Sequence, residues 1–196
     1  CIRDSDMGRE FRILNQLNAG FPYCPKAYVH CTDESLIGGE FYVMERVKGI
    51  ILRSDLPPEL GFDAARTEAL CKSFIDRLVE LHQVDYHAVG LADLGKPDGY
   101  VQRQIEGWAG RYEKALTPDA PRWEAVIAWL REKMPADHQR PGIIHNDYRF
   151  DNVILDADNP MRIIGVLDWE MTTLGDPLMD LGNTLALSLI HISEPT

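Results

Sequence analysis

Residues 145–152 read HNDYRFDN, so a histidine, two aspartates, an arginine and an asparagine occupy eight consecutive positions. Asp147 can orient or deprotonate a hydroxyl group, and Asn152 offers an amide oxygen to a hard metal ion. Asp168, sixteen residues after Asn152, directly follows the apolar run IIGVL and is a second oxygen ligand. Phosphoryl transfer needs a carboxylate base and a few oxygen ligands for Mg²⁺. Taken alone, Asp147 and Asn152 are more typical of a solvated turn.

Three short apolar runs surround these polar residues. Residues 142–145 and 152–155 flank the polar turn, and residues 162–170 contain Asp168. Their length and β-branched content predict strands. From residue 171 onward we expect a loop and then a helix.

Helical periodicity and capping residues predict four helices upstream, at residues 5–18, 63–84, 100–116 and 122–134. Ser5 or Asp6 can cap the first helix. The second has Leu70, Phe74, Leu78 and Leu81 on one face. The fourth is expected to start at Pro121 and to turn its apolar side chains toward the core, namely Trp123, Val126, Ile127 and Leu130.

A β-hairpin and a linker separate the first helix from the others. The β-branched and aromatic runs within residues 26–33 and 40–47 predict the hairpin. Residues 48–62 contain proline and glycine and form the predicted connection between two lobes. The element order indicates an α+β protein with a small N-terminal lobe and a mainly helical second lobe with β insertions. A ligand between two lobes is a common arrangement.

Composition argues against several classes of partner. The 196-residue chain has a net charge of −11, which disfavours nucleic acid and anionic membrane as main partners. No run approaches the roughly 18 apolar residues of a membrane span. The four cysteines form no CxxC pair, which predicts reduced thiols and a cytoplasmic location. The oligomeric state is left open.

The sequence resembles the aminoglycoside phosphotransferase-like, choline kinase-related family of small-molecule kinases. The segments IIHNDYRFDNVIL and VLDWEMTTLGDPLMDLG carry the resemblance. The segment LHQVDYHAVGLADLGKPDGYVQRQIEGW resembles the branch of kinase-like domains in acyl-CoA dehydrogenase-associated proteins. The resemblance implies a bilobal protein kinase-like fold, with a partial N-lobe at residues 1–50 and a C-lobe at residues 51–186.

The resemblance also implies roles for single residues. Asp147 would be the catalytic base, and His145 would brace its loop. Asn152, which also completes the catalytic loop, and Asp168 would bind Mg²⁺ on the phosphates of ATP. Arg149 is open between a solvated loop charge and a substrate contact.

Four further residues would serve nucleotide binding. Glu10 would pair with a strand lysine. Glu45 and Val47 would bind adenine through their backbone atoms, with Met44 at the back of the pocket. Farther along the chain, Asp176 and Asp180 are expected to be mainly structural.

The sequence departs from the family pattern at three places. Asn146 stands where the family usually has glycine, and asparagine also tolerates unusual backbone angles. No lysine precedes Lys26, and Gly8 is the only glycine before Gly20, so the Gly-rich loop and the phosphate-binding lysine are missing. The N-lobe is therefore expected to be truncated and this polypeptide a poor catalyst. Residues 187–196 resemble translated sequencing adapter and are expected to be a non-native tail.

The leading hypothesis is an ATP- and Mg²⁺-dependent phosphotransferase acting on a hydroxyl of a small molecule. The branch resemblance favours a hydroxy acid or a hydroxyacyl-CoA as the acceptor, and an aminoglycoside is the alternative. A pseudokinase, a nucleotide-binding domain of a larger protein, is the alternative from another class.

Overall fold

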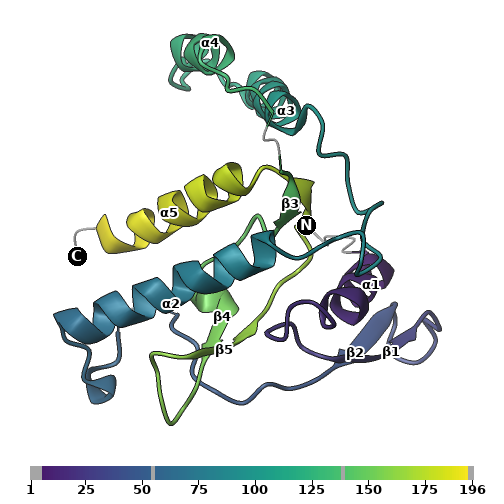
Figure 1. Ribbon diagram of the computed structural model, residues 1–196. Helices are drawn as coiled ribbons and strands as arrows, with labels where there is room; N and C mark the ends of the chain where they lie inside the picture. The colour runs from purple at the N-terminus through teal and green to yellow at the C-terminus, as the bar shows by residue number, and fades with distance from the viewer. Residues whose placement is uncertain (1–5, 54–55, 138–139, 194–196) are drawn as a thin grey trace.

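A computed structural model describes residues 6–53, 56–137 and 140–193, with side chains through residue 187. The helices are α1 (Met7–Leu17), α2 (Ala64–His82), α3 (Tyr100–Ala115), α4 (Glu124–Glu132) and α5 (Pro177–Ser193). The strands are β1 (Ala27–Cys31), β2 (Phe41–Met44), β3 (Gly142–Ile144), β4 (Val153–Leu155), β5 (Ile163–Val166) and β6 (Thr173–Gly175). Short 3-10 helices cover Pro58–Leu60 and Phe150–Asn152. Figure 1 shows α1 and the β1–β2 hairpin at one end and α3 and α4 at the other.

The strands form antiparallel pairs rather than one large sheet. Within the described residues the pairs are β1–β2, β3–β6 and β4–β5. The predicted hairpin at residues 26–47 and the three strands around the polar turn are confirmed. Strand β6 was not predicted, because a loop was expected there. It forms because Ile143 of β3 pairs with Leu174, and both side chains are buried in the core.

The first two helices form for the reasons their sequences indicate. Asp6 caps α1 by accepting a hydrogen bond from the N–H of Arg9, and Asp63 caps α2 in the same way through Arg66. The four predicted core residues of α2, Leu70 to Leu81, are all buried. A stripe of this width drives the helix against the rest of the protein.

One hydrophobic core joins the two predicted lobes. Leu14 and Leu17 of α1 belong to the same buried cluster as Leu78 of α2, Ile143 of β3 and Val166 of β5. Helix α1 is therefore packed directly on the elements that carry the polar turn. The lobe boundary at residue 50 stays a prediction.

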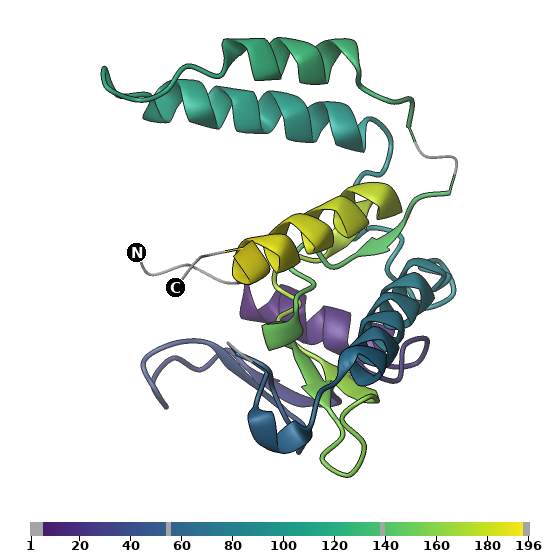
Figure 2. The same ribbon diagram turned by 90° about the vertical axis from the view of Figure 1, so that its left-hand side faces the viewer.

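The prediction for the fourth helix was wrong in two respects. Helix α4 begins at Glu124 after Trp123 rather than at Pro121. None of its residues is buried, and Val126 and Leu130 are exposed. Figure 2 shows α3 and α4 as an antiparallel pair above α5, and α4 packs on α3 rather than in the core. Helical periodicity identifies an apolar face but not what lies against it.

Most of the predicted tail is described only in its backbone. The backbone of α5 continues through Ser193, while the side chains after residue 187 and all of residues 194–196 are not described. The interpretation of residues 187–196 as a non-native tail stays a prediction.

Candidate active site

The polar turn begins where β3 ends and connects β3 to β4. His145 follows Ile144 and is fully buried, whereas Asp147 is half-buried. Asn146 has a φ of 66°, in the left-handed region that asparagine tolerates better than most residues. Asn146 therefore adopts one of the unusual backbone angles that asparagine was expected to tolerate. Its backbone reverses the chain so that Asp147 turns out of the core.

Asp147 and Asn152 are in direct contact across the turn. The side-chain Nδ2 of Asn152 donates hydrogen bonds to the backbone oxygen and to Oδ2 of Asp147, each 2.9 Å long. Both amide hydrogens are thereby used, which leaves Oδ1 as the atom of Asn152 that can bind a cation. Arg149 lies beside them, with its Nε 3.8 Å from Oδ1 of Asp147, and forms two hydrogen bonds to Asp151.

His145 braces the turn as a neutral side chain. Burial lowers the pKa of His145, although nearby carboxylates, chiefly Asp180, act in the opposite direction. Its Nδ1 accepts the N–H of Asp147 at 3.3 Å, so the proton sits on Nε2, which donates to the carbonyl of Leu167 at 3.0 Å. His145 thus links the residue before Asp168 to the residue that carries the candidate base.

The pairing of β4 with β5 brings Asn152 and Asp168 to the same end of one strand pair. Val153 pairs with Val166, and the N–H of Leu167 donates to the carbonyl of Asn152 at 2.8 Å. Asp168 comes next, is exposed, and has a φ of 66°. The register therefore places Asn152 and Asp168 at the same end of the strand pair. The role of both residues as metal ligands stays a prediction.

Asp180 of α5 holds the turn from behind. Its carboxylate is fully buried and accepts the backbone N–H groups of His145 and Asn146, each at 2.8 Å. His82, at the end of α2, contacts Oδ2 of Asp180 at 2.9 Å. Asp176 is also buried and accepts the N–H of Leu178 at the start of α5. The structure thus places both aspartates as supports rather than as ligands.

Glu10 reaches the site from α1. Its Oε1 accepts the N–H of Trp169 at 3.3 Å, and its carboxylate is hydrogen-bonded to Tyr42 of β2. Burial raises the pKa of Glu10, and the nearby charges of Asp168 and Glu170 act in the same direction. Among the described residues no lysine or arginine forms an ion pair with Glu10, so its predicted pairing with a strand lysine stays a prediction.

The predicted adenine-binding segment lies against the β4–β5 pair. Ile50 and Leu155 exchange backbone hydrogen bonds, and a side chain at Gly49 would collide with the carbonyl of Leu155. A side chain at Gly165 would meet Val47 at 3.4 Å, so Val47 lies over β5. This segment therefore touches the same strand pair that carries Asn152 and Asp168.

The backbone atoms of this segment differ in what they can offer a nucleotide. The N–H of Glu45 is used by the carbonyl of Lys26, so only its carbonyl can take part. The N–H of Val47 has no hydrogen-bond partner within the described chain. Met44, at the end of β2, is 40% exposed rather than enclosed. The roles of all three residues stay predictions.

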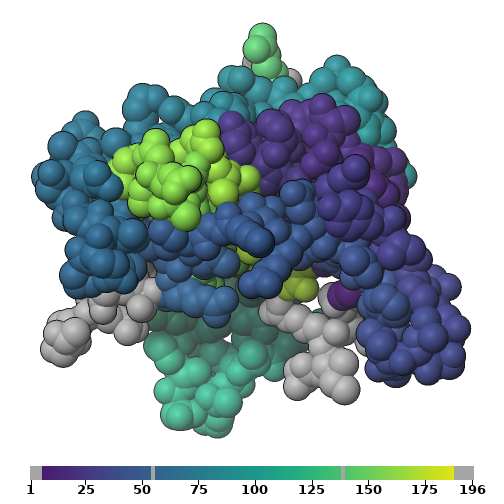
Figure 3. Space-filling model, turned by 90° about the horizontal axis from the view of Figure 1, so that it is seen from below, coloured from purple at the N-terminus to yellow at the C-terminus, as the bar shows by residue number. Residues whose placement is uncertain are grey.

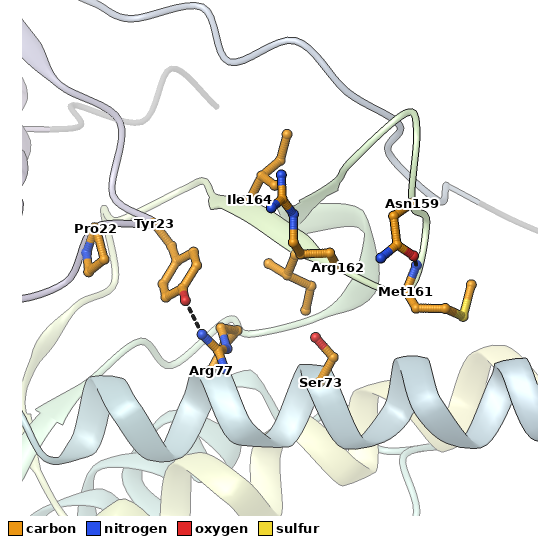
Figure 4. Close-up of a pocket in the computed structure, with 9 residues that line it drawn as sticks. Pro22, Tyr23, Ser73, Arg77, Asn159, Met161, Arg162 and Ile164 are labelled. Carbon is orange, nitrogen blue, oxygen red and sulfur yellow. Dashed lines mark hydrogen bonds between the residues drawn. The ribbon is translucent and has the colours of Figure 1, made fainter.

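A separate cavity of about 460 Å³ contains none of the predicted site residues. It lies between α2, the loop after α1 and the loop that joins β4 to β5, as Figure 4 shows. Figure 3 shows this end of the molecule, where the light-green surface of the β4–β5 loop adjoins the blue segment after β2. Arg77 on its wall already contacts Tyr23 and Glu80, and Arg162 pairs with Asp156. Both cations are therefore already paired.

The site residues fit Mg²⁺ by their chemistry. Asn152 and Asp168 offer one amide oxygen and one carboxylate, and Mg²⁺ takes few protein ligands when phosphate oxygens complete its shell. Within the described residues no group of three or more histidine, cysteine, aspartate and glutamate side chains could hold a metal ion. This finding is compatible with a site that uses one carboxylate and one amide.

Several supporting contacts were not found from the sequence. They are the contact between His82 and Asp180, the hydrogen bond from Tyr100 to Asn146, and the hydrogen bonds of Arg9 to the segment after Asp168. Each joins residues that are dozens of positions apart, so no local spacing could have indicated them.

Comparison with known proteins places the chain in a protein family. The family model described as "Phosphotransferase enzyme family" matches residues 3–195. Acyl-CoA dehydrogenase family member 11 from Gallus gallus is 39% identical over 174 residues, which are 88% of this chain and 22% of that protein. Acyl-CoA dehydrogenase family member 10 from Mus musculus is 39% identical over 188 residues, 95% of this chain and 17% of that protein. The chain thus spans about a fifth of these curated relatives.

Solved structures show the same fold. A protein from Ralstonia eutropha, provisionally described as an aminoglycoside phosphotransferase, superposes with a TM-score of 0.84 and 36% identity. The superposition covers 98% of this chain and 57% of that one. The GDP complex of aminoglycoside 2'-phosphotransferase-IIIa superposes with a TM-score of 0.69 at 17% identity, over 96% of this chain and 65% of that one, and shares the fold. The predicted kinase-like α+β fold is confirmed. In the described chain, no helix is both long and apolar enough to cross a membrane.

Proposed function

Because the chain belongs to the phosphotransferase enzyme family, we propose that it is the core of an ATP- and Mg²⁺-dependent kinase that phosphorylates a hydroxyl group of a small molecule. The observation that carries the proposal is the contact of Asp147 with Asn152, on a strand pair whose register brings Asp168 to the same end. A base and two oxygen ligands at one strand end suit phosphoryl transfer.

The chemistry of the proposed reaction falls mainly to Asp147. Its carboxylate orients the acceptor hydroxyl and takes its proton, while the hydroxyl oxygen bonds to the γ-phosphorus and the bond to the leaving oxygen of ADP breaks. Asn152 and Asp168 would hold Mg²⁺, which when bound neutralises charge on the phosphate oxygens. His145 and Asp180 keep the loop in place, so that the base is already oriented when substrate binds.

For the acceptor we propose a hydroxy acid or hydroxyacyl-CoA. The support is the similarity to acyl-CoA dehydrogenase family members 10 and 11 over most of this chain. An aminoglycoside is the alternative, supported by the name of the similar Ralstonia structure. A panel containing both kinds of acceptor, scored by ADP release, separates the two.

A pseudokinase that binds nucleotide without phosphate transfer is the second candidate. The observation that favours it is the similarity to one part of much larger proteins, since the chain spans about a fifth of acyl-CoA dehydrogenase family members 10 and 11. We also propose that the 196-residue polypeptide on its own is a poor catalyst.

The test compares nucleotide binding by this chain with phosphate transfer by the full product of its gene. Asp147→Asn should lower kcat by about 10²- to 10⁴-fold and leave ATP affinity nearly unchanged. Asp156→Asn, the same change at the residue that follows β4 and pairs with Arg162, is the matched control. Mg²⁺-dependent ATP binding with no ADP release from any acceptor would favour the pseudokinase. Normal turnover by Asp147→Asn would exclude the proposed role of this residue.

A further inference from the structure

The segment that follows Asp168 is held by two different parts of the molecule. We call residues 169–172 the post-ligand turn, because they connect Asp168 to strand β6. Within it the N–H of Thr172 donates to the carbonyl of Trp169 at 3.1 Å. Three consecutive carbonyl groups, those of Glu170, Met171 and Thr172, then accept hydrogen bonds from side chains outside the turn.

Arg9 of α1 makes two of these three hydrogen bonds. Its Nη1 donates to the carbonyl of Glu170 at 3.0 Å, and its Nη2 donates to the carbonyl of Thr172. The planar guanidinium spans two acceptors at once, which a lysine ammonium cannot do in the same geometry. Arg9 is half-buried, so these hydrogen bonds are partly shielded from water.

The third carbonyl is bound from the catalytic loop. Nδ2 of Asn146 donates to the carbonyl of Met171 at 2.9 Å. The neighbour of Arg9, Glu10, accepts the N–H of Trp169. The post-ligand turn therefore contacts two adjacent residues of α1 on one side and the residue before Asp147 on the other.

We propose that Arg9 is a positioning residue that fixes Asp168 for metal binding through the post-ligand turn, a role that rests on the proposed function. Asp168 has a φ of 66°, which is unfavourable for most residues and persists only where the surroundings hold it. Arg9 binds the backbone two and four residues after Asp168 and so restricts the orientation of its carboxylate. Through the same hydrogen bonds, the position of α1 affects the position of Asp168.

The chain offers a matched control on the same helix. Arg12 also donates hydrogen bonds to distant residues, but its partners are Asp93 and the carbonyl of Gly90. Arg12→Ala therefore removes an arginine and its ion pair from α1 without touching the post-ligand turn. Arg9→Lys retains the charge but has one donor nitrogen in place of the guanidinium group. It serves as a second variant should Arg9→Ala fail to fold.

The experiment has two readouts on the 196-residue chain. The first is hydrogen–deuterium exchange of the amides in residues 169–175. We expect exchange to rise by about tenfold or more in Arg9→Ala, less in Arg9→Lys, and not in Arg12→Ala. The second is the Mg²⁺ concentration needed for ADP binding by calorimetry. We expect it to rise by about tenfold in Arg9→Ala, toward the value of Asp168→Ala.

The outcomes separate the two proposals. Unchanged exchange in both Arg9 variants overturns the positioning role. The positioning role is also overturned if the Arg9 variants exchange faster but need no more Mg²⁺, while Asp168→Ala does need more. Arg9 would then be only structural. If neither the parent chain nor Asp168→Ala shows Mg²⁺-dependent binding, the proposed metal function fails, and exchange alone decides whether Arg9 orders the turn.

Discussion

Asn152 donates two hydrogen bonds from one amide nitrogen to Asp147, one to its backbone oxygen and one to its Oδ2, both at 2.9 Å. The first bond fixes the shape of the loop, and the second orients the carboxylate. Because both hydrogens point at Asp147, the amide oxygen of Asn152 is directed elsewhere. One side chain thus orients the candidate base and presents a ligand atom.

Asn152→Asp should lower kcat of the full gene product by about 10²-fold or more. The change removes both hydrogen bonds to Asp147 and places a second negative charge beside its carboxylate, so the candidate base is no longer held in place. Steady-state kinetics on the variant tests this, and an unchanged kcat contradicts a role for the contact.

Asp180→Ala should destabilise the protein by about 3 kcal/mol, because one buried and one partly buried backbone N–H group lose their acceptor. Asp176→Ala, the same change four residues earlier, removes the acceptor for one N–H at the start of α5 and should cost about 1 kcal/mol. Urea denaturation of both variants measures the difference. Equal losses would show that Asp180 does not anchor the loop.

Glu10→Gln should stabilise the protein at neutral pH, with an effect that disappears in acid. Since burial raises the pKa of Glu10 in the folded state above its unfolded value, the ionised carboxylate costs stability. The cost is absent below the unfolded pKa, about 4.3, and is complete above the folded pKa. Glutamine keeps an oxygen that can accept from Trp169. Thermal melts of both proteins between pH 4 and pH 8 test this. A stabilisation by Glu10→Gln that increases toward acid pH would contradict the prediction.

Leu78→Ala and Leu130→Ala compare the same chemical change at a buried and an exposed position. Leu78 of α2 is 1% exposed, so Leu78→Ala should lower the free energy of unfolding by about 2–5 kcal/mol. Leu130 of α4 is 38% exposed, so Leu130→Ala should lower the free energy of unfolding by only about 1 kcal/mol. Chemical denaturation gives both values. If both variants lost the same free energy of unfolding, the predicted burial of α4 would be supported instead.

Much of the local structure followed from local chemistry. The apolar spacing of α2, the cap Asp6, and the order of His145, Asp147 and Asn152 are all patterns within a short stretch of sequence. A pattern of that range can be interpreted without knowing the fold. The unusual backbone angle of Asn146 belongs to the same group, because only a few residue types tolerate it.

Local sequence patterns could not predict strand β6 or the surroundings of α4. Strand β6 is three residues long and exists because β3, about thirty residues earlier, pairs with it. The apolar face of α4 has the periodicity of a core helix, yet α4 packs on α3 above α5 and leaves that face largely open. Pairing and burial depend on partners that local sequence does not identify.

The spacing of Asp147, Asn152 and Asp168 predicts which residues could carry the chemistry, because a carboxylate base and oxygen ligands at that spacing can be recognised without the fold. How those residues are held is seen only in the tertiary structure. Asp180 reaches the loop across 34 positions and Arg9 reaches the post-ligand turn across 161. Such contacts form only when packing of the shared core brings distant segments together, and buried hydrogen-bonding groups then take the partners that the fold places beside them.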